Sequence, residues 1–261
     1  MIVHGTKLRE RKLGWVAEFC PICRTVRACQ LIRVGLVSHI YFVGFGDGKL
    51  VGFQVECSEC KTRIGTQETR HHSIERKNLG DLATLVAATF PNLPEILGER
   101  LATEKQLRED PSTITAELRR KLIAEPFSIL NPEVESRQQQ TQFDKPAAFG
   151  CLGTAVVTAA GIFGFTYVPK RWDDLAGYAL LSLVGIGIIY TIVQLALVNR
   201  RHYRELTLPR LVRALQPIKP NAGELEAAIL HCREMGMKIG KQVRVQDVVR
   251  ELESRHSGLA A

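Results

Sequence analysis

The sequence FCPICR occupies residues 19–24, and VECSECK occupies residues 55–61. Each stretch holds two cysteines with two residues between them. The four cysteines are Cys20, Cys23, Cys57 and Cys60. Two matched pairs of this kind are typical of a metal site, a redox centre or a disulfide framework, and the redox state of the compartment decides among them. The compartment has to be inferred from the rest of the chain.

Two long apolar segments lie in the second half of the chain, at residues 147–168 and 175–198. They hold 22 and 24 residues without a charged side chain. As helices they would extend about 33 and 36 Å, which is enough to cross a hydrocarbon core of about 30 Å. Three aromatic side chains near the short connector suit a membrane interface: Tyr167, Trp172 and Tyr178. We predict a two-helix transmembrane hairpin in preference to a buried hairpin of a soluble core.

The charges that flank these segments predict their orientation. Residues 199–213 contain five arginines, and Arg137 and Lys145 precede the first segment. The connector contains two basic and two acidic residues. Because basic residues collect on the cytoplasmic side, we predict an integral protein of the inner or plasma membrane with both terminal regions in the cytoplasm. The net charge of +8 would also suit contact with anionic lipid or nucleic acid.

A reducing cytosol favours a metal site over disulfide bonds for the paired cysteines. One CxxC turn, here called a knuckle, can direct two thiolates at one ion, and two knuckles complete the tetrahedral shell of zinc. The sequence KLVGFQVEC (49–57) alternates as a strand does, and Asp47-Gly48 before it is a hairpin signal. A ribbon of this size has little core of its own, and a bound metal would compensate for that. The pattern predicts a small β zinc ribbon with a closed, structural site.

The sequences LGWVAEFCPICR (13–24) and LIRVGLVSHIYFVGFGDGKLVGFQVECSEC (31–60) resemble the zinc-ribbon domain at the N-terminus of several poorly characterised bacterial membrane proteins. The resemblance covers roughly the first 65 residues, about a quarter of the chain, and it implies no established activity. It implies one structural zinc ion held by the four cysteines of the knuckles. Arg24 and Lys61 stand where many knuckles have glycine. We expect these cations to stabilise a four-thiolate zinc site, whose net charge is −2.

The four cysteines of the knuckles could also serve an iron site or a redox centre. An iron site of the rubredoxin kind uses the same four thiols, so the ligands alone leave both metals open. A thioredoxin-like redox centre is less consistent with the sequence, because there are two matched pairs and no βαβ pattern. The remaining cysteines are interpreted as packing residues: Cys29, Cys151 and Cys232.

Residues 69–146 are predicted to form helices and a polar linker into the membrane. Apolar residues recur at helical spacing in LGDLATLVAATF (79–90). Glu104 and Arg108 are interpreted as an exposed i,i+4 pair, and His71 with its neighbour His72 as part of a solvated linker.

The C-terminal region, residues 199–261, combines basic juxtamembrane sequence with two short helices. The sequence LPRLVRAL (208–215) carries Arg210 and Arg213 and would suit either a position on lipid headgroups or the basic stop-transfer flank of the second span. In NAGELEAAILHCREMG (221–236), an apolar stripe predicts one buried helix face: Leu225, Ala228, Ile229 and Cys232.

These observations predict a multi-domain α+β membrane protein. We expect four parts: a zinc ribbon at 1–68, a helical cytoplasmic segment and linker at 69–146, a transmembrane hairpin at 147–198, and a basic, helical C-terminal tail at 199–261.

The sequence contains no familiar nucleotide-binding or hydrolase motif, so we expect no catalytic residues and no small-molecule substrate. We predict a membrane-anchored, non-enzymatic zinc-ribbon protein that acts as a cytoplasmic interaction or scaffold module. Its expected partners are the bilayer and another protein, or a second copy through the hairpin. A ridge of small residues that includes Gly150, Thr154 and Thr158 suits close helix packing, either within the hairpin or between copies. One alternative is an accessory subunit of a membrane enzyme complex.

The other alternative is a membrane-tethered ribbon that binds nucleic acid, which the net charge of +8 and the basic residues around the knuckles suggest. Binding of DNA by the C-terminal tail is less favoured, because the tail lacks the dense basic stripe of a nucleic-acid interface. The basic residues around the knuckles are Arg24, Arg27, Arg33, Lys61 and Arg63.

Overall fold

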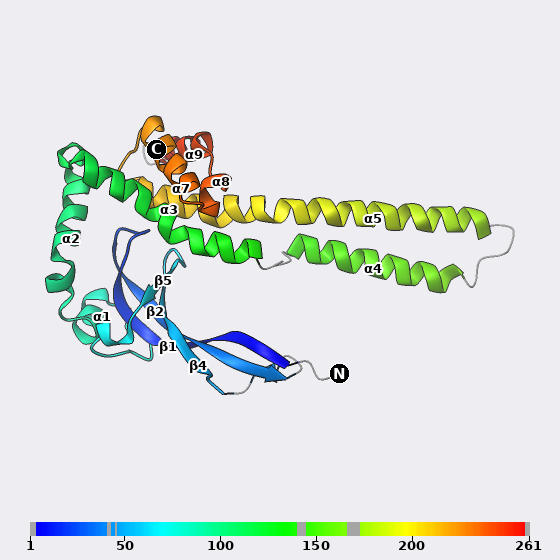
Figure 1. Ribbon diagram of the computed structural model, residues 1–261, viewed down its shortest axis with the longest axis horizontal. Coiled ribbons are helices and arrows are strands. Elements are labelled where there is room, and N and C mark those ends of the chain that lie inside the picture. Colours follow the sequence, from blue (N-terminus) through cyan, green and yellow to red (C-terminus); the bar gives the residue numbers. More distant parts are fainter. Residues whose placement is uncertain (1–3, 41–42, 45, 140–144, 166–172, 259–261) are drawn as a thin grey trace. The chain divides into compact units, whose positions relative to one another are not determined.

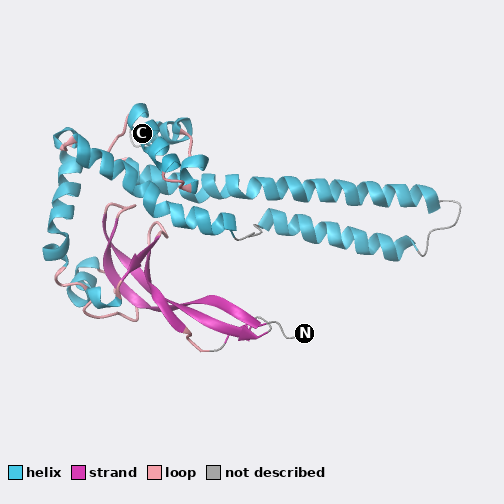
Figure 2. Ribbon diagram, in the orientation of Figure 1, coloured by secondary structure: helices cyan, strands magenta, loops and turns pink. Residues whose placement is uncertain are grey.

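The N-terminal part of the chain forms an antiparallel sheet with strand order β1-β2-β4-β5 (Figure 2). The computed structural model describes residues 4–40, 43–44, 46–139, 145–165 and 173–258. The strands are β1 (His4–Cys20), β2 (Thr25–Ile40), β3 (Val43–Gly44), β4 (Lys49–Cys57) and β5 (Arg63–Thr66). The two-residue strand β3 pairs with β2. Strand β4 has the bounds predicted for residues 49–57, and β1 and β2 are longer than a small ribbon requires.

Both knuckles are hairpin turns, and they lie at the same end of the sheet. The first joins β1 to β2, with Cys20 paired to Thr25. The second joins β4 to β5. Because Cys29 of β2 pairs with Cys57 of β4, the register between these strands places the two turns side by side. At the other end of the sheet, β4 follows the predicted turn at Asp47-Gly48, and Gly48 has φ +67°.

The rest of the described chain is mainly helical (Figures 1 and 2). The helices are α1 (Leu82–Thr89), α2 (Leu93–Glu109), α3 (Ala116–Gln139), α4 (Lys145–Phe165), α5 (Asp173–His202), α6 (Leu208–Leu215), α7 (Ala222–Glu234), α8 (Lys238–Gln242) and α9 (Val245–Gly258). Short 3-10 turns are η1 (Glu68–Arg70) and η2 (Pro111–Thr113), and η4 (Tyr203–Thr207) is a π-helix. The chain divides into two compact units, Met1–Asn131 with Arg210–Ala261, and Pro132–Pro209.

The knuckle end of the sheet packs against α1. Ala17 of β1 lies in one buried cluster with Leu85, Phe90 and Leu93, and its amide N–H donates to the buried hydroxyl of Thr89 at 2.9 Å. These contacts bury the apolar face that the periodicity of residues 79–90 predicted.

The segment that precedes α1 returns along the outer edge of β1. Trp15 and Glu75 exchange two backbone hydrogen bonds of 2.6 and 2.9 Å. Gly14 lies beside a bulge in β1, and a side chain there would collide with the Glu75 carbonyl. A glycine is therefore needed for the two chain segments to approach each other this closely.

The interpretation of His71 as part of a solvated linker is wrong. Its imidazole is completely buried, its ring meets Phe90 edge-on at 5.6 Å, and its Nε2 lies 3.4 Å from Glu18 Oε2. The return of this segment along β1 carries His71 into the core, whereas its neighbour His72 stays exposed. Adjacent residues of an extended segment face opposite sides, which explains the difference.

Helices α4 and α5 lie side by side in their own unit (Figure 1). Their segments Pro146–Gly164 and Gly177–Leu215 are long and apolar enough to cross a membrane, and only 11% and 6% of their most apolar windows are buried. A Cβ on Gly187 would lie 2.6 Å from Thr154, and one on Gly150 would lie 3.2 Å from Thr191. Part of the predicted small-residue ridge therefore packs within the hairpin. The connector after Phe165, with Tyr167 and Trp172, lies outside the described residues.

The helical path from α5 continues through η4 into α6. The expectation that residues 208–215 rest on lipid headgroups is not met by their apolar side chains, since Leu211, Val212 and Leu215 are fully buried. They pack within the same unit as the sheet. Helix α7 has the predicted buried stripe, and the structure adds a capping box in which Asn221 and Glu224 bond each other's backbone N–H groups.

Glu224 also joins α7 to α3, because Arg119 Nε donates to its carboxylate at 2.6 Å. Hydrogen bonding from Arg119 lowers the pKa of Glu224 below its ordinary value. The pair therefore stabilises the fold above the ordinary glutamate pKa, and this contribution is lost as pH falls through the lowered value. We predict that Glu224→Gln reduces the unfolding free energy at pH 7 by about 1 kcal/mol or less.

Urea unfolding of the detergent-solubilised chain tests this prediction. The difference between Glu224→Gln and the unsubstituted chain should shrink as the pH falls from the ordinary glutamate pKa through the lowered pKa of the folded state, below which the carboxylate is protonated in both states. Glu226→Gln, at an exposed position of the same helix, is the control. If Glu224→Gln lost as much stability below the lowered pKa of Glu224 as it does at pH 7, the assignment to this ion pair would be contradicted.

Candidate metal centre

The two knuckles bring four sulfur atoms together. The Sγ atoms of Cys20, Cys23, Cys57 and Cys60 all lie within 4.8 Å of one another. Cys20 and Cys60 are 3.5 Å apart, and Cys23 and Cys57 are 3.9 Å apart. Cys23 is half-buried and the other three are buried. All seven cysteines of the chain are free thiols.

The backbone of each knuckle shapes the cluster. In the first, the Cys23 N–H donates to Cys20 Sγ at 3.4 Å. In the second, the Lys61 N–H donates to the Cys57 carbonyl at 3.0 Å. The residue after each pair is left-handed, with φ 53° at Arg24 and 58° at Lys61. The glycine-like conformation expected at these positions is therefore present without glycine.

These distances fit a metal ion bound by four thiolates. With metal–sulfur bonds of about 2.3 Å, the sulfurs of a tetrahedral zinc site are about 3.8 Å apart. The two measured separations lie close to this value. The donor set suits zinc or iron, and its four sulfurs complete a tetrahedral shell. The structure gives the arrangement that the spacing predicted, and the identity of the metal stays a prediction.

The thiols also influence one another's ionisation. Hydrogen bonds from Cys20 and then from other thiols of the cluster lower the pKa of Cys60 to about 6 and also lower the pKa of Cys57. The pKa of Cys20 is raised, chiefly by its hydrogen bond with Cys23. Thiolate is the form that binds metals.

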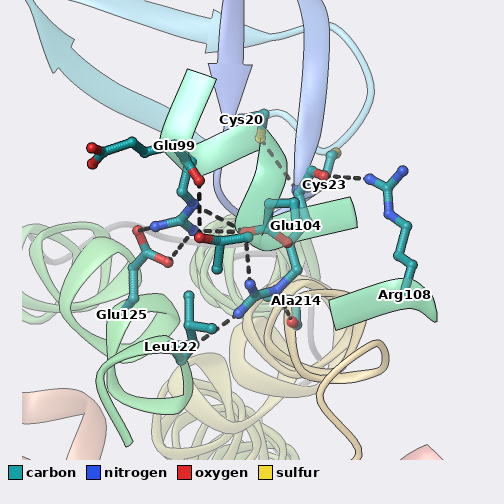
Figure 3. Close-up of polar contacts among 11 residues, drawn as sticks. Cys20, Cys23, Glu99, Glu104, Arg108, Leu122, Glu125 and Ala214 are labelled. Atoms are coloured by element: carbon teal, nitrogen blue, oxygen red, sulfur yellow. Dashed lines mark hydrogen bonds and ion pairs between the residues drawn. The ribbon is translucent and has the colours of Figure 1, made fainter. Parts of the chain in front are cut away.

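Arg24 connects the first knuckle to three helices. Its guanidinium is buried and donates to Glu104 Oε1 of α2 at 2.9 Å, to the Leu122 carbonyl of α3 at 2.9 Å and to the Ala214 carbonyl of α6 at 2.5 Å. Figure 3 shows Glu104, Leu122 and Ala214 around this point. We call these four residues the Arg24 network.

The two carbonyls of the Arg24 network lack helical partners. The acceptor of Leu122 would normally pair with the N–H of residue 126, but Pro126 has none. Ala214 lies in the last turn of α6, where carbonyls have no partner within the helix. Arg24 therefore supplies hydrogen bonds that two buried helix positions would otherwise lack.

A chain of alternating charges extends from Arg24. Glu104 Oε1 also accepts from Arg100 Nε at 3.0 Å, and Arg100 binds both carboxylate oxygens of Glu125. The interpretation of Glu104 and Arg108 as an exposed pair is wrong, because Glu104 is only 2% exposed and serves Arg24 and Arg100. Arg108 instead donates to the backbone carbonyl of Arg24 at 2.5 Å. Both arginines donate to Oε1 of Glu104, whereas its Oε2 is buried without a hydrogen-bond partner among the described residues.

The cation that faces the sulfur cluster is Arg213 of α6. Its Nη1 donates to Cys23 Sγ at 3.9 Å and lies 3.5 Å from Glu59 Oε1. We expected Arg24 and Lys61 in this role, but the Arg24 side chain turns to Glu104. Sequence reasoning missed Arg213 because 190 residues separate it from Cys23.

Two of the three cysteines outside the cluster are buried. Cys29 and Cys232 are buried, as expected for packing residues, whereas Cys151 is exposed on α4.

Among the basic residues considered for nucleic-acid binding, Arg33 donates to the backbone of Asp47 and Gly48, and Arg63 pairs with Glu56 and Glu10. Together with the buried Arg24, three of those five residues are engaged within the protein.

Comparison of the chain with protein-family models, with curated proteins and with solved structures finds no match. The four-cysteine cluster is consistent with the zinc-ribbon resemblance. The geometry of the chain itself must therefore support any functional conclusion.

Metal analysis tests the four-sulfur site. We predict one metal ion per chain, and we predict that Cys60→Ser lowers metal affinity by at least about 10-fold and lowers the thermal midpoint, because structural metal binding contributes directly to folding. Competition with a chelator and circular dichroism of the detergent-solubilised chain measure the two effects. Cys151→Ser, at an exposed position, should change neither. A metal affinity of Cys60→Ser equal to that of the unsubstituted chain would exclude that sulfur as a ligand.

A pair of glycine substitutions tests the Arg24 network. Arg24→Gly should reduce the unfolding free energy by about 3–5 kcal/mol, because Glu104 would be left buried without this partner. Lys61→Gly should change it by less than about 1 kcal/mol, since relief of left-handed strain offsets the flexibility of glycine. The two positions have nearly the same φ, but Lys61 is exposed. Equal effects in denaturant unfolding would mean that only the backbone conformation matters.

Proposed function

We propose that this chain is a membrane-anchored, non-enzymatic protein whose sheet and helices are organised by one structural zinc ion. Four clustered sulfurs carry the proposal, because they fill a tetrahedral shell. Catalytic zinc sites usually have three protein ligands and an open position, whereas closed four-thiolate sites are structural. The proposed ion would be held by Cys20, Cys23, Cys57 and Cys60.

The connections of the cluster support a structural role. The residue that follows the first pair, Arg24, binds three helices, and Arg213 from one of those helices contacts Cys23. A metal ion that fixes the knuckle would therefore also fix the Arg24 network. In this proposal the zinc ion stabilises the N-terminal sheet and the C-terminal helices together.

Two exposed apolar helices support the membrane anchor. Large side chains such as Phe163, Leu181 and Ile189 are at least 64% exposed. Such surfaces are costly in water and suit a lipid environment. The flanking arginines support an orientation with both terminal regions in the cytoplasm of the cell.

A groove between α3 and α7 supports a role in protein interaction. It has a volume of about 590 Å³, and apolar side chains such as Ile123 and Ala227 line it. Arg120, Lys121 and His231 also line it. Lys121 is paired with Glu117, and Glu224 within the groove is paired with Arg119. We propose that this groove binds an acidic amphipathic helix of a partner protein, because its apolar floor and its surplus of basic groups are complementary to such a segment.

Purification of the full chain from membranes tests the proposal. We expect it to stay in the membrane pellet after alkaline carbonate washing, to contain one zinc ion, and to retain a partner protein whose bound segment is acidic. Tags at both ends should be digested in inverted vesicles and protected in intact cells. Iron in place of zinc would overturn the identity of the metal. A chain that carbonate removes from the membrane would overturn the membrane anchor, and tags accessible from outside the cell would overturn the orientation.

Ala227→Glu tests the groove, since it adds bulk and negative charge at an exposed position of its lining. The variant should keep its zinc and its membrane location but lose the partner. Ala222→Glu, at an exposed position on the same helix outside the lining, is the matched control. An enzyme activity that co-purifies through the same groove would instead indicate an accessory subunit of an enzyme complex.

A further inference from the structure

Two consecutive residues of α6 meet two consecutive residues of the first knuckle. Arg213 donates to Cys23 Sγ, and the Ala214 carbonyl accepts from Arg24. These contacts join parts of the chain that are 190 residues apart. The last turn of α6 is therefore attached directly to the candidate metal centre.

Arg213 also spans the two knuckles. Its guanidinium lies 3.5 Å from Glu59, which stands between Cys57 and Cys60. Its other contact, Cys23, is the only half-buried member of the cluster, and the other three are buried. Arg213 therefore reaches the sulfur that solvent, chelators and electrophiles can approach most easily.

The chemistry of such a contact is specific. A divalent ion with four thiolates has a net charge of −2, and a guanidinium beside it is favourable. A charge-assisted N–H···S hydrogen bond also withdraws electron density from the thiolate, which slows its protonation and its reaction with electrophiles. Groups that contact metal ligands in this way commonly tune metal affinity by 10- to 100-fold.

We propose that Arg213 is a positioning residue of the metal centre, which couples retention of the metal to docking of α6 on the first knuckle. The inference depends on the proposed metal site. When α6 is docked, Arg213 protects Cys23, and the ion leaves slowly. When the ion is removed, the repulsion among the sulfurs and the mobility of the knuckle weaken the docking of α6. The coupling is reciprocal, as thermodynamic linkage requires.

Metal release from the full, detergent-solubilised chain tests the first half of the coupling. The rate of transfer to the chromogenic chelator 4-(2-pyridylazo)resorcinol should rise about 10-fold in Arg213→Gln. Alkylation of Cys23 by N-ethylmaleimide, followed by mass spectrometry, should accelerate in parallel. Arg213→Lys keeps the positive charge but lacks the planar guanidinium, so its rates of metal transfer and alkylation should lie between those of Arg213→Gln and the unsubstituted chain. Arg250→Gln, an exposed arginine on α9, should match the unsubstituted chain.

Hydrogen exchange tests the second half. Removal of the metal should increase amide exchange at residues 213–215 of α6, and Arg213→Gln with metal bound should show part of that increase. Glu59→Gln removes the exposed partner of Arg213 and should give a smaller acceleration of metal release. This variant provides the test if Arg213→Gln does not fold.

The outcomes separate this inference from the proposed function. Unchanged release and alkylation in both Arg213→Gln and Glu59→Gln, with one metal ion still bound per chain, would overturn the role of Arg213 and leave the metal site intact. A chain that binds no metal would overturn both. Faster release without any change in α6 exchange on metal removal would also overturn the coupling.

Discussion

The arrangement of the sheet and the helices depends on the buried guanidinium of Arg24. It donates hydrogen bonds to three acceptors from different helices. These are a carboxylate of α2, a carbonyl of α3 that Pro126 leaves without a donor, and a carbonyl at the end of α6. An arginine has enough N–H groups, in a fixed plane, to serve all three at once. Burial lowers the pKa of Arg24, and the charge of Glu104 opposes that shift. Each charge in the network has a partner of opposite sign, so removal of one partner would leave a buried charge uncompensated.

The position of Arg24 in the knuckle links this network to the sulfur cluster. A left-handed residue usually favours glycine, and an arginine with φ 53° bears some strain. The same backbone conformation directs its side chain away from the sulfurs and into the helices. Its carbonyl, which belongs to the knuckle, accepts from Arg108 of α2. The strain is thus offset by contacts that only a long, charged side chain at this position can make.

The sequence predicted local features more successfully than distant contacts. The spacing of the cysteines predicted their clustering, and apolar stripes predicted α1 and the buried face of α7, because these patterns act within one turn or one strand. The burial of His71 and the contacts of Arg24 and Arg213 were not predicted. Glu104, Leu122 and Ala214 lie 80, 98 and 190 residues from Arg24, and no local pattern encodes such pairings. Pro126 indicates from the sequence alone that the Leu122 carbonyl lacks its helical donor, but nothing in the sequence indicates that Arg24 replaces it.

The two knuckles show how one local motif can serve two purposes. Both have the same cysteine spacing and the same left-handed residue, yet Lys61 faces solvent and Arg24 is buried. The second knuckle contacts the helices through Glu59, which pairs with Arg213 of α6. The first also contacts α2, α3 and α6 through Arg24, which follows the candidate metal ligand Cys23 directly in the chain. A distortion at Cys23 would move Arg24 as well, and for this reason the sulfur cluster has consequences far beyond the sheet that contains it.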